Sequence, residues 1–104
     1  MKLRSNEIES KGAQYIANSY AVRNLTVLDL SSNHIMDDGF KFLANASYLS
    51  NLKKLYVNDC GLTFQAAKYL KESKFIGRLR VLHIGKNQLK EEGSGYISTA
   101  SNLD

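Results

Sequence analysis

Apolar and polar residues recur along the chain with a period of 27 residues. Aliphatic side chains fill the first column of this pattern, which contains Met1, Leu28, Leu55 and Leu82. The column two positions later is also aliphatic and contains Leu3, Leu30, Val57 and Ile84. The chain is therefore predicted to be a single domain of four repeat units, at about residues 1–24, 25–51, 52–78 and 79–104.

Each unit changes its hydrophobic period halfway. Leu28, Asp29 and Leu30 alternate between apolar and polar, as a strand with one buried face does. Between residues 39 and 49, the apolar positions are three and four apart, which predicts a helix face. Repetition of strand and helix in one direction predicts an α/β fold with about four parallel strands on one side and helices on the other. Because helices need more width than strands, we expect a curved stack with the strands on its concave face.

Three segments carry a resemblance to a known family: LTVLDLSSNHIMDDG, LKKLYVNDCGLTFQA and LRVLHIGKNQLKEEG. They resemble the leucine-rich repeat pattern LxxLxLxxN/CxL, followed by a small residue that opens a helix. The helical half and the alternation of asparagine with cysteine are similar to the ribonuclease-inhibitor-like subclass. The resemblance implies a right-handed β-α solenoid that forms a short horseshoe arc. It also implies a protein-binding role, as in inhibitors, regulators and bacterial effectors.

The composition restricts the class of protein but does not indicate an activity. Apolar residues make up 43% of the 104 residues and charged residues 23%, as in an ordinary globular domain. The opening residues MKLRSNEIES lack the apolar core of a secretion signal, and no apolar run is long enough for a membrane span. A lone cysteine, Cys60, also favours a reducing compartment. We therefore expect a cytoplasmic protein, or one delivered to a host cytoplasm if it is an effector, without a cofactor.

Several prominent residues are expected to be structural. The column of Asn6, Asn33, Cys60 and Asn87 predicts buried side chains that bond to backbone groups after each strand. No metal site is predicted, because Cys60, His34 and His83 fall on different parts of the repeat. The aromatic column is predicted to pack between helices and contains Tyr15, Phe42, Tyr69 and Tyr96. Acidic residues at predicted helix starts need no ligand, and these are Asp37, Asp38, Glu91 and Glu92.

The side chains between the buried leucines should point to the concave face and form rows across the strands. One row contains Lys2, Asp29, Tyr56 and His83. The repeat itself does not require Tyr56 or His83, and tyrosine is a favoured interface residue. The predicted protein-binding surface consists of Asp29, Ser31, Lys54, Tyr56, Asn58, Asp59, His83 and Lys86. The alternative is that these are solvated strand residues without a partner.

Two other functional classes receive less support from the sequence. Positive charge in the second half is compatible with RNA binding, through Lys53, Lys54, Lys68, Lys71, Lys74, Arg78 and Arg80. A charged, solvated exterior explains these residues more simply, and the net charge is only +4. An enzyme is not expected, because Asp29 and His83 should lie two strands apart, at about 10 Å, with Tyr56 between them.

The two ends of the repeat stack show no polar capping sequence. Stacked repeats normally need such a cap to cover the terminal core. We therefore expect the ends to pair, either through self-association of copies or because the chain is a fragment of a longer array.

Overall fold

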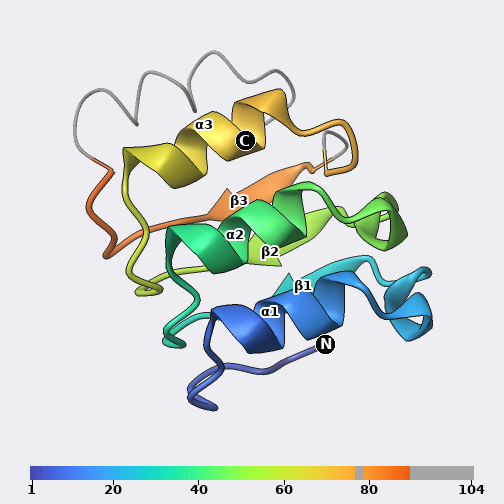
Figure 1. Cartoon of the computed structure of the whole chain (residues 1–104), viewed down its shortest axis with the longest axis horizontal. Coiled ribbons are helices and arrows are strands. Elements are labelled where there is room, and N and C mark those ends of the chain that lie inside the picture. Colours follow the sequence, from blue (N-terminus) through green and yellow to red (C-terminus); the bar gives the residue numbers. More distant parts are fainter. Residues whose placement is uncertain (77–78, 90–104) are drawn as a thin grey trace.

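The computed structural model describes residues 1–76 and 79–89. Along the chain, α-helices alternate with short strands: α1 (Ser10–Ala17), β1 (Val27–Asp29), α2 (Met36–Ala44), β2 (Lys54–Tyr56), α3 (Phe64–Glu72) and β3 (Val81–His83). Two 3-10 turns, η1 (Tyr20–Val22) and η2 (Ser47–Leu49), precede β1 and β2. The helices lie side by side as one layer in front of the sheet (Figure 1). The predicted α/β layering is therefore observed.

The three strands form one parallel sheet in the order β1-β2-β3. Leu28 pairs with Leu55, and Leu55 pairs with Leu82. Each partner is 27 residues further along, so the register confirms the alignment of the leucine column that the sequence predicted. These leucines point toward the helices, and Leu28 and Leu55 are fully buried.

The predicted fourth strand is not confirmed. In the first unit, Lys2 forms only an isolated parallel bridge with Asp29. The Leu3 amide donates to the Asp29 carbonyl at 2.8 Å, and the Asp29 amide donates to the Met1 carbonyl at 2.9 Å. The first segment thus lies beside β1, where the fourth strand was expected. Only one of its residues pairs in register, however, and a single bridge does not make a strand.

The helices begin earlier and end earlier than the apolar spacing suggested. Helix α2 starts three residues before Gly39 and ends at Ala44, and Leu49 belongs to η2 instead. Gly39 does not have a positive φ, so the backbone conformation does not require glycine there. What matters is that glycine has no side chain. A Cβ atom there would lie 2.6 Å from Ile35 Cγ2 and 3.1 Å from the Ser10 Cα. The small residue therefore lets α2 approach α1 closely.

The aromatic column does not pack as predicted. Tyr15 is 79% exposed and Phe42 is 37% exposed, whereas Tyr69 is partly buried against the core. In α1 the buried residues are Ala13 and Ala17, so a side chain two positions after Ala13 points away from the core. The prediction is wrong for Tyr15, and Tyr96 lies outside the described residues.

Asp37 has a structural partner in the next unit. Its carboxylate accepts hydrogen bonds from the Thr63 amide at 2.9 Å and from the Thr63 hydroxyl at 2.5 Å. Thr63 in turn caps α3 by accepting from the Gln65 amide. The Asp37 carboxylate at the start of α2 is therefore hydrogen-bonded within the fold. Glu91 and Glu92 lie outside the described residues. Within residues 1–76 and 79–89, no helix is long and apolar enough to cross a membrane.

Candidate functional site

The face of the sheet opposite the helices presents the predicted row of side chains. Asp29 lies opposite Tyr56 in register, and Tyr56 lies opposite His83. Lys54 is exposed two residues before Tyr56 on the same strand. We refer to the surface formed by Asp29, Lys54, Tyr56 and His83 as the open strand face. The alignment of these residues across the strands is as the sequence predicted.

Tyr56 and His83 form a ring pair at the centre of this surface. Their ring centroids are 4.8 Å apart and their planes are inclined by 53°. Tyr56 is partly buried and His83 is exposed. The contact limits the rotamers of both rings, so a partner would lose less side-chain entropy on binding them.

Behind this row, polar side chains form a ladder between successive strands. The Ser31 hydroxyl accepts a hydrogen bond from the Asn58 amide at 3.1 Å. Asn58 Oδ1 accepts one from the Gly85 amide at 2.7 Å. Ser31 is only 1% exposed, so the prediction that it belongs to the protein-binding surface is wrong. Its hydroxyl bonds to the neighbouring strand instead of facing a partner. Asn58 remains partly accessible, and sequence reasoning did not anticipate its role in the ladder.

The predicted residues at the strand ends lie beside a separate hollow. Asp59 and Lys86 both adopt left-handed backbone conformations, with φ of 52° and 54°. Ser5 and Ser32 occupy the same column of the repeat and share this conformation. The hollow has a volume of about 260 Å³, and its lining consists of Arg4, Ser32, Asn58, Asp59, Gly85 and Lys86. Asp59 and Lys86 therefore belong to the strand-end turns and extend the open strand face in that direction.

The asparagine column has the predicted structural role. Asn33 Oδ1 accepts from the amides of Asn6 and Ile8, at 2.8 and 2.9 Å. Its Nδ2 donates to the carbonyls of Leu3 and Leu30. Cys60 is buried in the same column, and its thiol donates to the Leu30 carbonyl at 3.2 Å. Asn33 and Cys60 therefore hold the turns after the strands and are buried, as predicted. The prediction of a buried side chain is wrong for Asn6, which is exposed.

The site lacks the arrangement that acid–base or nucleophilic catalysis needs. Tyr56 separates Asp29 from His83 in the register, and Asp29 Oδ1 accepts from the Ser31 amide. Burial raises the pKa of the Cys60 thiol, so the thiol stays protonated and unreactive at neutral pH. In the described part of the chain, no three His, Cys, Asp or Glu side chains gather as metal ligands would. Among the described residues, this face therefore presents no paired acid and base and no activated nucleophile.

The sequence model of the family described as Leucine Rich repeat matches residues 2–17 and 23–44. These matches support a leucine-rich repeat family. They cover most of the first unit and the second unit through the end of α2. Beyond the matched residues, the leucine column continues in register from β2 to β3. No curated protein matches the chain. Leucine-rich repeats generally mediate protein–protein interaction and are typically non-enzymatic.

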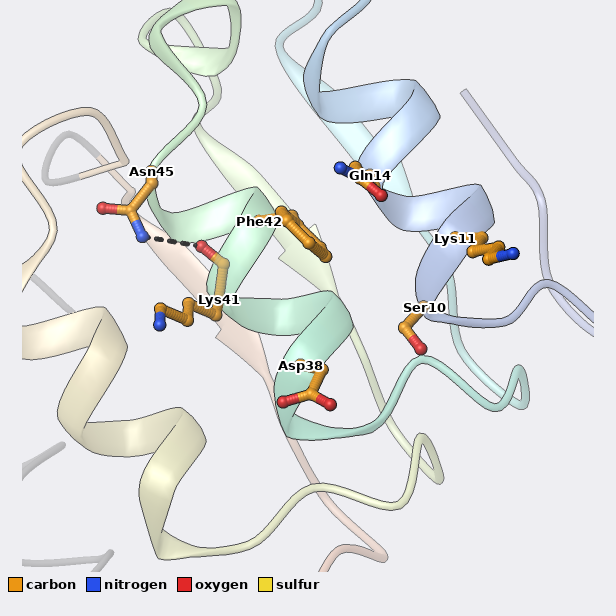
Figure 2. A pocket seen from close by; sticks show the side chains of 7 residues that line it. All are labelled: Ser10, Lys11, Gln14, Asp38, Lys41, Phe42 and Asn45. Atoms are coloured by element: carbon orange, nitrogen blue, oxygen red, sulfur yellow. Dashed lines mark hydrogen bonds between the residues drawn. The ribbon is translucent and has the colours of Figure 1, made fainter.

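Two surface features of the chain were not anticipated from the sequence. A hollow of about 390 Å³ lies between α1 and α2, and its lining consists of Ser10, Lys11, Gln14, Asp38, Lys41, Phe42 and Asn45. Figure 2 shows Phe42 pointing across this hollow toward α1. The second feature is a contact between η1 and η2, where Tyr20 and Tyr48 meet edge to face at 5.6 Å. The 27-residue columns gave no signal for either. Phe42 was predicted to pack between helices without leaving a hollow, and Tyr20 has no aromatic equivalent at residue 47.

Proposed function

We propose that this chain is a non-enzymatic protein–protein interaction module that binds a protein partner through the open strand face. The proposal includes a right-handed, ribonuclease-inhibitor-like solenoid in which this face is concave. An inhibitor, regulator or effector role in a cytoplasm fits such a module. The observation that carries the proposal is the paired rings of Tyr56 and His83, which are accessible at the centre of aligned strands and required by no core contact.

The size of the open strand face determines what else a partner would touch. Three strands spaced about 4.8 Å apart, each showing about 10 Å of length, offer only a few hundred Å². A standard interface buries about 800 Å² on each partner. The partner is therefore expected to extend over the strand-end hollow, where Asn58, Asp59 and Lys86 are accessible.

The RNA alternative receives no support from the structure. Lys68 lies in α3, in the layer opposite the open strand face, whereas Lys53 and Arg80 lie at the strand starts. The basic side chains of the second half thus do not form one continuous surface. The ring of Tyr56 contacts His83 and is only partly accessible for stacking on a base.

Replacing Tyr56 or His83 by alanine should weaken partner binding while leaving the fold intact. Loss of a central aromatic contact typically weakens an interface by about 30-fold. The partner would first be captured by cross-linking from a lysate of the native organism, and its dissociation constant would then be measured for each variant. Tyr15→Ala is the matched control, because Tyr15 is 79% exposed on the helix side.

Equal partner affinity for Tyr56→Ala, His83→Ala and the unmodified chain would contradict the assignment to the open strand face. Light scattering on the same samples would show whether copies associate. If self-association is abolished by Tyr56→Ala, the partner is a second copy of the chain.

A further inference from the structure

The charges of the molecule are distributed unevenly between its two edges. Strands run in one direction and helices return in the other, so all helix-to-strand turns lie together on the right of Figure 1. The described turn residues of this edge, 19–26, 45–53, 73–76 and 79–80, contain no aspartate or glutamate. Most carboxylates of the described part lie instead at the strand ends and helix starts, and these are Glu7, Glu9, Asp29, Asp37, Asp38 and Asp59. Glu72, the last residue of α3, lies on the same side as the turns.

Cations from successive units lie next to one another on this edge. The Arg80 amide donates to the Lys53 carbonyl at 2.8 Å, so these two residues are neighbours across β2 and β3. Asn51 Nδ2 donates to the Arg23 carbonyl at 2.9 Å, which joins the first turn to the second. Lys54, the first residue of β2, follows Lys53 in the sequence. We call this surface the basic edge, formed by Arg23, Lys53, Lys54 and Arg80.

The cations of the basic edge are exposed and carry no ion pair to a carboxylate among the residues that the structure describes. Helix dipoles do not account for them, because the dipole acts within the last helical turn, and Lys53 lies well beyond the end of α2 at Ala44. Four neighbouring like charges repel one another and favour binding of an anionic partner.

Aromatic side chains at this edge hold one of the cations in place. The Arg23 guanidinium lies 3.9 Å from the Tyr20 ring centroid, and Nη1 donates to the Tyr20 carbonyl at 3.1 Å. Tyr20 is 61% exposed and also contacts Tyr48 edge to face. A guanidinium fixed in this way keeps other N–H donors directed to solvent, where they can bind a carboxylate in two-point geometry.

We propose that the basic edge binds an acidic segment of a protein partner. Arg23 covers one face of the Tyr20 ring, so that face cannot stack on a base, which favours a peptide over RNA. Tyrosine beside arginine is also the composition typical of protein interface centres. This surface goes beyond the proposed function: it shares Lys54 with the open strand face, but Arg23, Lys53 and Arg80 lie outside that face and favour an acidic partner.

The test uses the full chain and a fluorescein-labelled peptide of about ten glutamates, with binding followed by anisotropy at low salt and again at about 300 mM NaCl. We expect saturable, salt-sensitive binding. The double variant Lys53→Ala with Arg80→Ala should bind about tenfold more weakly. A variant with Lys11→Ala and Lys68→Ala removes the same charge from exposed helix positions, and its affinity should change less than about twofold.

Absence of saturable peptide binding would overturn the inference. So would an equal loss in both double variants, since this would mean that only the net charge matters. A labelled poly-uridine strand of about ten nucleotides is measured in parallel. Tighter binding of this strand than of the peptide, lost in the basic-edge variant, would assign the edge to nucleic acid instead. Tyr56→Ala should leave peptide binding unchanged, so the open strand face and the basic edge are tested separately.

Discussion

Replacing Leu55 by alanine is expected to destabilise the chain by about 2–5 kcal/mol. Leu55 is fully buried in the central strand, between Leu28 and Leu82 of the neighbouring strands. The substitution removes three side-chain carbons and leaves a cavity that cannot close without moving both neighbours. A domain of this size has a total stability near the lower end of about 5–15 kcal/mol, so a large share would be lost.

Urea denaturation followed by far-ultraviolet circular dichroism measures this effect. With a slope of about 1–3 kcal/mol per molar urea, the midpoint should fall by about 0.7 M or more. Lys54→Ala, at the exposed neighbour of Leu55 on the same strand, should change stability by less than about 0.5 kcal/mol. If the two variants denature at the same urea concentration, the sheet does not pack on the helices through the leucine column.

Most of the repeat architecture could be predicted from the sequence, because it depends on which side chains are buried. The column of Leu28, Leu55 and Leu82 fixed the strand register, since a shift by one residue would move every leucine to the opposite face of the sheet. Helix ends were less predictable. Leu49 is as apolar as a helical core residue but packs from a 3-10 turn, and periodicity alone does not distinguish the two.

The candidate surfaces could be predicted only in part. Tyr56 and His83 were found because strand geometry places residues between buried leucines on the open face. Ser31 follows the same alternation as Asp29, so the same reasoning placed it on the open face. Its hydroxyl instead accepts a hydrogen bond from the Asn58 amide, a contact that depends on the turn after the strand. The Arg23–Tyr20 stack also escaped prediction, because it arises within a 3-10 turn whose side-chain directions follow no strand or helix period.

The second large effect is expected for Asn33→Ala, at about 2–4 kcal/mol. The Asn33 side chain is 2% exposed and joins two repeat units. Its oxygen accepts from two amides of the first unit, and its nitrogen donates to the Leu3 and Leu30 carbonyls. Alanine leaves these backbone groups without partners in a part-buried turn, where each lost partner is costly. The turn of the first unit should loosen before the rest of the chain unfolds.

The asparagine column itself supplies the controls for this prediction. Asn6 is exposed, and its side chain bonds only to the Arg4 carbonyl, so Asn6→Ala should cost less than about 0.5 kcal/mol. Asn33→Cys should fall between the two, because Cys60 shows that a thiol in this column can still donate to a strand carbonyl. Thermal and urea denaturation give the order of stability, and amide hydrogen exchange at Asn6 and Ile8 reports the turn directly. An equal cost for Asn6→Ala and Asn33→Ala would mean that side-chain hydrogen bonds in this column do not hold the repeats together, and that burial of leucine alone does.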